Sequence, residues 1–551
     1  MKRPTTETAL LLLAMAGFAT LLLGGLGHPL FWSDEADTAM FGTRVLESGY
    51  PKVHGPDNVV YQFGPDIALG VKESVDAYIG TTWGHFYFAV PGLWWAETVA
   101  DPWAKTARVR LPFAVAGALG LCLWLAAVLP ALGPERGRRR RFAALFFALA
   151  AVSVSLLLHL REARYYALLV LVAGAIARVQ LLRSAYATLS SRRYAAELAG
   201  LLFLLFHVFF AAWFAFTALL ASERAVAIWR RRAPTSDLLP FALSVALVAP
   251  VLVFFETFHV ATVFARDLGL GPRAWAANVL EVGRHLLRHE MLAPALACRA
   301  TVAWTACGSA TGRRVSTQLL GFGLGYVLLG ALNPLALERY FIVLSPLLLC
   351  AFLLDAFALA EGLPARWPRI PRRRAGAVVA AALALLTLAM RLPSLAELRG
   401  RLAELQTPVR GPLDFVIPHL LASTPRPQDL VVATNYEEQV FMYYLGARTI
   451  VGTTLNNLLA DRERLPDVVV PRRRWPRSLR ELAPFLRQGE WEELRFPVRD
   501  VHFNQVPALS RSRFVPDPHH FETPATDDPE AQLVIYWRRD SSKRTGTSSS
   551  P

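Results

Sequence analysis

The chain has 551 residues, of which 54% are hydrophobic, and its mean hydropathy is +0.34. So many long apolar runs exclude an ordinary soluble globular protein and indicate a polytopic membrane protein. The net charge of +15 does not indicate nucleic-acid binding, because much of the arginine falls in short loops between apolar runs, as expected of cytoplasmic loops. The four cysteines lie in apolar segments, without the spacing of a disulfide framework or a zinc site.

The apolar runs predict a transmembrane domain over residues 1–391, with eleven helices that start at a cytoplasmic N-terminus. The run 195–229 is too long for one span, so we expect it to break near His207. The arginine clusters of the short loops then all lie in the cytoplasm, and the C-terminal region lies outside it. The predicted spans are 9–26, 111–132, 142–160, 165–182, two within 195–229, 238–255, 291–307, 315–332, 340–359 and 375–390.

Residues 32–37, directly after the first apolar run, read Trp-Ser-Asp-Glu-Ala-Asp and place three acids within four positions. In one interpretation, Asp34 caps a short helix over 35–48, and acids in the first turn favour the positive end of the helix dipole. In the other, Asp34 and Glu35 line an active site at the membrane surface. The two interpretations are compatible, and the rest of the chain favours the second.

The first outer loop is predicted over residues 28–107, and it is acidic, which suits the outer face of the membrane. Its second half, from Trp83 to Trp103, is rich in tryptophan, tyrosine and phenylalanine. Aromatic side chains at this density favour the headgroup layer, so we expect a helix that lies on the membrane surface. An ordinary buried amphipathic helix is the alternative.

The composition changes after residue 391, where short runs rich in β-branched residues alternate with helical stretches. This pattern predicts a soluble α/β domain over residues 392–540, outside the cytoplasm. The tail 541–551 is rich in serine and threonine and is predicted to be disordered. The predicted strands are 429–434, 448–452, 467–470 and 532–537, with a helix through 440–445 between the first two.

The order of these motifs resembles the GT-C membrane glycosyltransferases. Asp34-Glu35 follows the first helix, Arg164-Tyr165 closes an Arg-x-x-Arg-Tyr turn, and Arg339-Tyr340 lies in Glu-Arg-Tyr-Phe at the start of a late helix. The resemblance covers about residues 9–390 and is greatest to the bacterial relatives of protein O-mannosyltransferases and of the lipid A aminoarabinose transferase. The aminoarabinose enzymes carry Lys-Pro-Pro late in the first loop, whereas residues 81–86 here read Thr-Thr-Trp-Gly-His-Phe.

The resemblance implies an inverting transferase in the bacterial inner membrane that moves a hexose or pentose from a polyprenyl-phosphate carrier to a hydroxyl on the outer face. The acceptor is a protein, a lipid or a glycan. A carboxylate must take the proton of the attacking hydroxyl, and Asp34, with Glu35 beside it, is the candidate. Arginines at outer helix ends suit the lipid phosphate, although snorkelling anchors are the alternative. The predicted donor-binding residues are Arg161, Arg164, Tyr165, His207, Arg339 and Tyr340.

A divalent metal is a further expectation, because relatives of this kind sometimes hold one, and Glu35 with His259 are the residues proposed for it. His207 is equally well explained as an ordinary core histidine. Two other classes of function remain open: a transporter or flippase of lipid-linked sugars, and a non-catalytic sugar-binding membrane protein. Transporters often show matching halves with broken helices, whereas this sequence shows one break and no repeated half.

Overall fold

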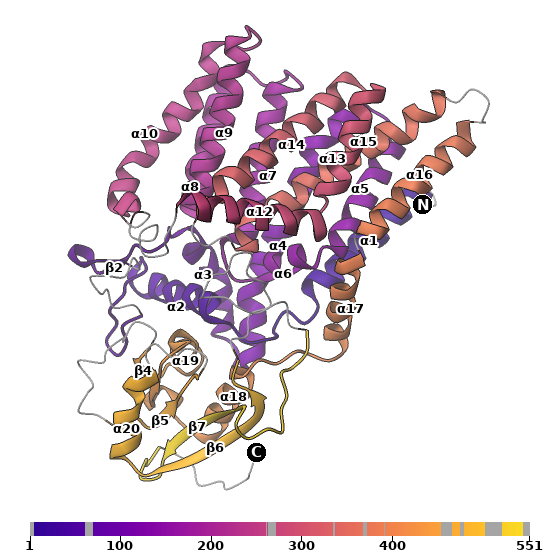
Figure 1. Cartoon of the computed structure of the whole chain (residues 1–551). Coiled ribbons are helices and arrows are strands. Elements are labelled where there is room, and N and C mark those ends of the chain that lie inside the picture. The colour runs from indigo at the N-terminus through magenta and orange to yellow at the C-terminus, as the bar shows by residue number, and fades with distance from the viewer. Residues whose placement is uncertain are drawn as a thin grey trace.

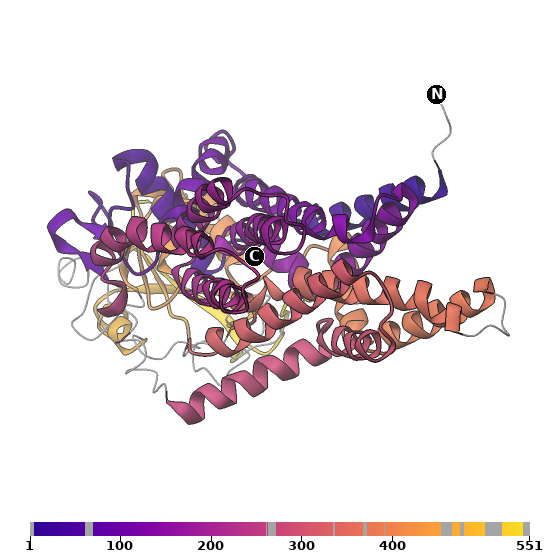
Figure 2. The ribbon, with the colours of Figure 1, turned by 90° about the horizontal axis from the view of Figure 1, so that it is seen from above.

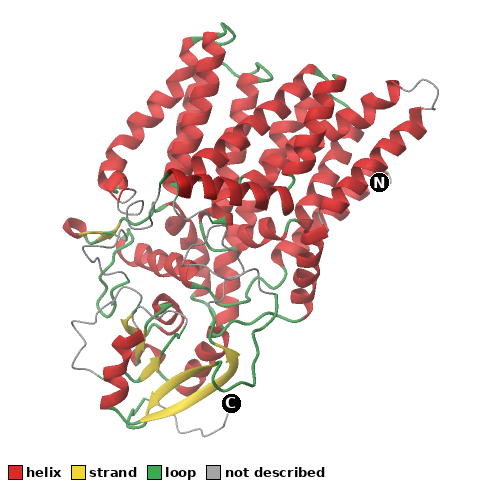
Figure 3. Ribbon diagram, viewed as in Figure 1, coloured by secondary structure: helices red, strands yellow, loops and turns green. Residues whose placement is uncertain are grey.

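The computed structural model shows a bundle of long helices with a sheet domain beyond one end (Figure 1). Among the described residues, the strands gather in that domain except for a short hairpin elsewhere (Figure 3). Seen from above, the long helices lie alongside one another (Figure 2). The structure describes residues 5–60, 70–259, 262, 271–333, 337–366, 372–390, 392–452, 465–473, 479–501 and 521–543.

Six helices of the described chain are long and apolar enough to cross a bilayer, so the protein is a polytopic helical membrane protein. They are α1 (Thr6–Leu23), α4 with its 3-10 extension (Pro102–Leu132), α7 (Tyr165–Ser184), α9 (Phe210–Trp229), α10 with the turn before it (Thr235–Phe254) and α15 (Leu344–Gly362). The predicted spans on α8 (Ser191–Val208), α13 (Leu292–Thr305), α14 (Ala310–Gly330) and α16 (Arg372–Met390) are not among them. The total of eleven spans therefore stays a prediction.

The predicted span 142–160 is broken. It consists of α5 (Arg136–Val152) and α6 (Val154–Arg161), which are bent by 82° and could form a seventh span together. Ser153 between them has an extended backbone, with φ −82° and ψ 92°, and its hydroxyl donates a hydrogen bond of 3.1 Å to Glu290. Serine readily trades helical backbone bonds for such side-chain bonds, and the apolar pattern gave no sign of it.

The predicted break near His207 is present, two residues further on. Helix α8 ends at Val208, α9 begins at Phe210, and Phe209 between them is extended, with φ −157° and ψ 100°. The predicted outer loop over 256–290 contains a helix instead, α12 (Pro272–Arg288), which lies across the ends of the bundle helices (Figure 1).

Two helices fill the first outer loop. Helix α2 (Ser33–Ser48) starts two residues before the predicted position and ends at Gly49, whose φ of 81° suits glycine. Helix α3 (Gly84–Ala96) buries one face, while Trp94 and Trp95 are exposed. This arrangement is compatible with the predicted position on the membrane surface. The hairpin of β1 (Val71–Lys72) and β2 (Ala77–Tyr78) lies between the two helices in the chain.

The C-terminal domain contains a five-stranded mixed sheet in the order β4-β3-β5-β7-β6. The four predicted strands are present, but the edge strand β6 was missed because its sequence, Trp-Glu-Glu-Leu-Arg-Phe-Pro-Val-Arg, is mostly polar. The centre is parallel, and β7 joins it antiparallel. The elements are α18 (Leu413–Ser423), β3 (Val431–Thr434), α19 (Glu438–Leu445), β4 (Arg448–Val451), β5 (Val468–Val470), α20 (Ala483–Gln488), β6 (Trp491–Arg499) and β7 (Gln532–Arg538).

Helix α17 (Leu392–Gln406) follows the proposed domain boundary but packs on α1, α5 and α6, not on the sheet. The predicted disordered tail is described only as far as Lys543. The boundary between residues 391 and 392 therefore separates the two regions by sequence character and not by packing.

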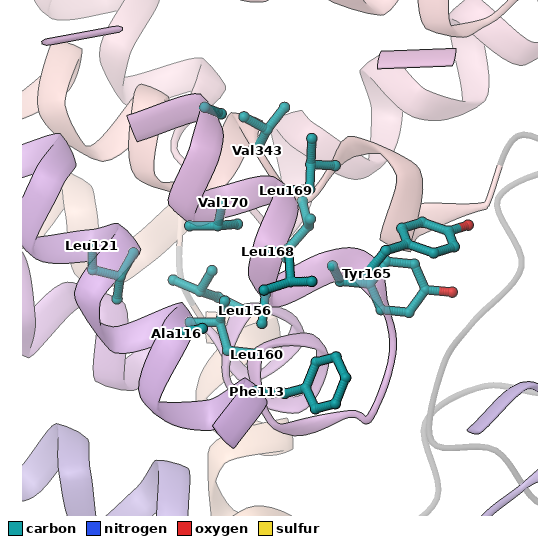
Figure 4. Close-up of a cluster of buried hydrophobic side chains, with 14 of the residues drawn as sticks. Phe113, Ala116, Leu121, Leu156, Leu160, Tyr165, Leu168, Leu169, Val170 and Val343 are labelled. Atoms are coloured by element: carbon teal, nitrogen blue, oxygen red, sulfur yellow. The ribbon is translucent and has the colours of Figure 1, made fainter. Parts of the chain in front are cut away.

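Helices α4 and α7 approach each other closely because small residues lie where they cross. A Cβ atom on Gly120 would lie 2.8 Å from the backbone nitrogen of Leu171, and one on Gly174 would lie 2.9 Å from the carbonyl of Gly120. The apolar cluster beside this crossing includes Phe113 and Leu168, and Tyr165 lies at its edge (Figure 4). The tight packing fixes the start of α7, where two of the predicted site residues lie.

Candidate active site

Asp34 lies in the first turn of α2 and is held by two arginines. Its Oδ2 atom is 3.2 Å from Arg339 Nη2 and 3.7 Å from Arg164 Nη2, and Arg164 Nη1 also donates to the Asp34 carbonyl at 2.9 Å. The Asp34 side chain is 27% exposed, whereas those of Arg339 and Arg164 are 5% and 11% exposed. Among the described residues, Oδ1 has no hydrogen-bond partner. One oxygen is therefore held, and the other is accessible.

The helix-cap interpretation of Asp34 does not describe what its side chain does. Trp32 occupies the N-cap position, and the start of α2 has no side-chain cap hydrogen bond. The carboxylate still lies in the first turn, where the helix dipole favours negative charge. Its bonds nevertheless go to the two arginines.

Arg339 has more donors than the described residues use. It lies on a 3-10 turn (Glu338–Phe341), is buried, and its guanidinium carbon lies 4.7 Å from the centre of the Trp32 ring. Its Nε and Nη1 atoms, like Nε of Arg164, have no hydrogen-bond partner among the described residues. Buried polar groups in native proteins are usually paired, so these donors indicate a binding position for an anion.

An aromatic wall adjoins these arginines and is built by the break between α8 and α9. The Phe209 ring stacks on Tyr165 with centroids 4.8 Å apart and lies 5.4 Å from the ring of Tyr340. The Arg164 guanidinium carbon lies 5.3 Å from the centre of the Tyr165 ring. Asp34, Arg164, Tyr165, Arg339 and Tyr340, all predicted from the sequence, are thus brought together. Phe209 was missed, although the broken apolar run marked its position.

Glu35 does not lie in the same site as Asp34. Its two oxygens accept hydrogen bonds from Arg110 at 2.8 and 2.5 Å, and the backbone nitrogen of Ala163 donates another at 2.8 Å. Arg110 also donates to the carbonyls of Leu26 and Pro29. Glu35 is completely buried and ties α2 to α4 and to the α6–α7 turn. The prediction that Glu35 has a catalytic role is therefore corrected to a scaffolding role.

Arg161 is also used by the scaffold. Its guanidinium donates to the carbonyls of Gly24 and His28 at 3.3 and 2.7 Å and to Glu404 at 3.1 Å. These acceptors come from the end of α1 and from α17, which is far away in the sequence. Arg161 was predicted to contact the donor phosphate. In the structure, its hydrogen bonds instead join α6 to the end of α1 and to α17.

Within the described ranges, neither candidate histidine makes a polar contact. His207 is half-buried, its ring lies 4.7 Å from that of Phe203 and 5.6 Å from that of Phe206, and the described residues give its side chain no hydrogen bond. His259 is exposed. The predicted metal pair of Glu35 and His259 does not fit an ion, because Arg110 and Ala163 already occupy Glu35. No group of three or more metal-binding side chains within the described ranges could hold a metal.

The segment directly before Asp34 is fixed by the C-terminal domain. The backbone nitrogen of Leu30 donates to Asp414 Oδ1 at 3.0 Å, and that of Phe31 donates to the Tyr444 hydroxyl at 3.1 Å. Trp103 Nε1 also donates to Asp414 at 2.8 Å. Burial raises the pKa of Asp414 to about 6, although hydrogen bonds from Trp103 and from backbone nitrogens act in the opposite direction.

Comparisons with known proteins find similarity at the level of solved structures. No family model matches the sequence, and no curated protein matches it. The crystal structure of ArnT from Cupriavidus metallidurans in the apo state has 12% identity and a TM-score of 0.49, and the match covers 96% of this chain and 97% of that chain. The chain resembles ArnT along nearly its whole length.

A second similar structure is the archaeal oligosaccharyltransferase AglB from Archaeoglobus fulgidus, solved with an inhibitory peptide and a dolichol-phosphate. It has 12% identity and a TM-score of 0.46, covering 84% of this chain and 69% of that one. A structure of the Archaeoglobus fulgidus oligosaccharyltransferase with Zn and sulfate has 12% identity and a TM-score of 0.47, covering 80% and 62%. ArnT and AglB are GT-C enzymes, the class that the sequence motifs resemble.

Proposed function

We propose that the protein is an inverting glycosyltransferase that moves a sugar, a hexose or a pentose, from a polyprenyl-phosphate carrier to an acceptor hydroxyl on a protein, lipid or glycan. The observation that carries the proposal is the position of Asp34. Its partly exposed carboxylate lies beside two buried arginines, and both arginines have donors that no described residue uses. A base and an anion-binding position are thereby adjacent, as this reaction requires.

In the proposed reaction, the acceptor oxygen attacks the anomeric carbon of the donor sugar. The new bond forms between these two atoms, and the bond from the anomeric carbon to the phosphate oxygen breaks. The electron pair leaves with the phosphate, and the acceptor proton passes to Asp34 Oδ1. Because Arg339 contacts Asp34 through Nη2 only, its Nε and Nη1 can stabilise the negative charge on the leaving phosphate.

The proposed site is on the outer face of the membrane. It lies where the bundle meets α2 and the C-terminal domain, so a carrier whose tail stays in the bilayer could present its phosphate there (Figure 1). The aromatic rings of Tyr165, Phe209 and Tyr340 offer an apolar wall beside the arginines. The domain after residue 391 would then lie outside the cytoplasm.

The substitution Asp34→Asn tests the base. Asparagine has nearly the same shape, so α2 should form and the protein should insert normally, while loss of a general base typically costs about 10²–10⁴ in rate. Mass spectrometry of envelope glycans and lipids, from cells with and without the wild-type gene, identifies the product. We expect membranes containing Asp34→Asn to form it at least about a hundredfold more slowly than wild type.

Glu35→Gln provides a matched control on the neighbouring carboxyl. It removes the charge of a completely buried carboxylate that pairs with Arg110, so we expect it to lower the melting temperature more than Asp34→Asn does, because the Asp34 carboxylate is partly exposed. Normal transfer by Asp34→Asn would remove Asp34 as the base. Purified wild-type protein that forms no new glycosidic bond but moves lipid-linked sugar across vesicles would instead support the flippase alternative.

A further inference from the structure

His85 lies in the first turn of α3, inside the segment where the sequence departs from Lys-Pro-Pro, and it is fully buried. The start of α3 is pressed against the end of α8. A Cβ atom on Gly84 would lie 2.5 Å from the carbonyl oxygen of His207 and 2.9 Å from its carbon. Only glycine allows this approach, which places the next side chain, His85, in the interior.

The His85 ring shares its surroundings with Asp34. It meets the Tyr165 ring edge-on at 5.5 Å, and Tyr165 lies against the Arg164 guanidinium and stacks on Phe209. Arg164 in turn donates to the backbone of Asp34 and pairs with its carboxylate. His85 therefore borders the wall that the arginines and the aromatic rings form around the proposed reaction site.

In the described part of the chain, the polar atoms of His85 are not satisfied. Among the described residues, neither ring nitrogen has a hydrogen-bond partner, and the same is true of the buried hydroxyl of Thr82 one turn earlier. A buried imidazole without partners lowers stability relative to an apolar ring of similar size. The aromatic neighbours Phe86 and Tyr165 would accept such a ring. Because no described residue pairs with these nitrogens, we infer that a bound ligand supplies the partner.

The charge state of His85 narrows the chemistry of that partner. Burial, and then the positive charge of Arg164, holds the pKa of His85 well below its usual value, although the nearby Thr82 backbone acts in the opposite direction. The imidazole is thus neutral, with one nitrogen that donates and one that accepts. A phosphate oxygen can only accept hydrogen bonds, and in the proposed site the arginines already offer donors to it. A sugar hydroxyl can both donate and accept hydrogen bonds.

We propose that His85 hydrogen-bonds a hydroxyl of the donor sugar and is a specificity-determining residue of the site. This inference rests on the proposed transferase function. It assigns His85 to the sugar, and the unused donors of Arg339 and Arg164 to the phosphate.

Two variants test the assignment, with bare undecaprenyl phosphate and a panel of undecaprenyl-phosphate hexoses and pentoses as probes. His85→Phe fills the space without polar atoms, and His85→Gln keeps one donor and one acceptor. We expect the melting temperature of ligand-free His85→Phe to equal or exceed that of wild type, and both variants to bind bare undecaprenyl phosphate like wild type. For the sugar-bearing carrier that wild type prefers, His85→Phe should lose about tenfold in affinity, and His85→Gln should recover part of it.

Arg339→Ala is the control for specific phosphate binding, since it should lose affinity for bare undecaprenyl phosphate. If His85→Phe loses the bare carrier as well, His85 contacts the phosphate and the inference is wrong. If His85→Phe binds and transfers every sugar like wild type, His85 is only a core residue and the inference is again wrong. If wild type itself binds neither carrier form, the proposed function fails, and the inference fails with it.

Discussion

At the scale of single residues, Asp34 and Glu35 point in different directions because successive helical residues are about 100° apart around the axis. Glu35 faces α4, where its carboxylate accepts hydrogen bonds from Arg110. Asp34 faces the turn before α7 and the 3-10 turn that carries Arg339. The same contrast separates the arginines. Arg161 donates to carbonyl groups and to Glu404, whereas two nitrogens of Arg339 have no partner among the described residues.

We predict that Arg339→Ala and Arg164→Ala each weaken the binding of undecaprenyl phosphate roughly tenfold to a hundredfold. The reason is the loss of one charge-assisted hydrogen bond to the phosphate, worth about 1.5–3 kcal/mol. Titration of the purified protein with the carrier measures the effect. Arg108→Ala is a matched control, because Arg108 lies over the Trp95 ring, away from the site. We expect this variant to bind the carrier like wild type. Normal binding by both site variants would make these arginines structural.

At the scale of elements, the position of α2 is set by elements distant in the sequence. Glu35 ties it to Arg110 on α4, and Arg401 on α17 donates to the carbonyls of Leu21 and Gly24 at the end of α1. Asp414 on α18 and Tyr444 on α19 bind the backbone directly before Asp34. Pre-organisation of the site thus depends on the C-terminal region as much as on the bundle.

A pH dependence follows from Asp414. Its pKa is raised to about 6 in the folded protein, from an unfolded value near 3.9, so the folded state holds its proton more tightly between these two values. Stability from this group is therefore present below about pH 4 and is lost as the pH rises through about 6, by up to about 3 kcal/mol. Asp414→Asn should remove this dependence.

Melting temperatures of wild type and Asp414→Asn between pH 4 and 7 measure the effect. The wild-type value should fall relative to that of the variant across this range, since other titrating groups are common to both proteins. Parallel curves would show that the hydrogen bonds from Leu30, Trp103 and Gly411 keep the carboxylate ionised in the folded state.

At the scale of the whole molecule, the sheet domain closes one end of the bundle and fixes the loop that carries Asp34 (Figure 1). The first outer loop is bound directly as well, because Asn58 donates to the Ala447 carbonyl and accepts from the Thr449 backbone nitrogen. The domain and the proposed site therefore lie on the same side of the membrane. An experiment that shows on which side the domain lies also shows on which side the site lies.

We predict that this side is the outer face. Alkaline phosphatase, which is active only outside the cytoplasm, should be active when it is joined after Pro551, and green fluorescent protein joined at the same place should not fluoresce. The arginine-rich loops motivate the expectation, since such loops stay in the cytoplasm. Bright fluorescence with inactive phosphatase would reverse the topology and place the proposed site in the cytoplasm.

The sequence alone determined the features that depend on local pattern. Apolar runs predicted most long helices to within a few residues. The length of the run 195–229 predicted a break, which the structure has at Phe209. Runs of β-branched residues predicted four of the five strands of the C-terminal sheet. These signals are local because each element must bury its own apolar face or satisfy its own backbone. The polar strand β6 and the bend at Ser153 carry no such signal.

Only the tertiary structure decided which charged residues come together in the proposed site. Asp34, Arg164 and Arg339 meet although 305 positions separate the first from the last, while Glu35 and Arg161, which the sequence also put forward, are paired with Arg110 and Glu404. A charged side chain has the same sequence signature whether it serves the scaffold or a ligand. Its role depends on whether the fold brings partners to all of its donors and acceptors, and those partners come from segments far apart in the chain.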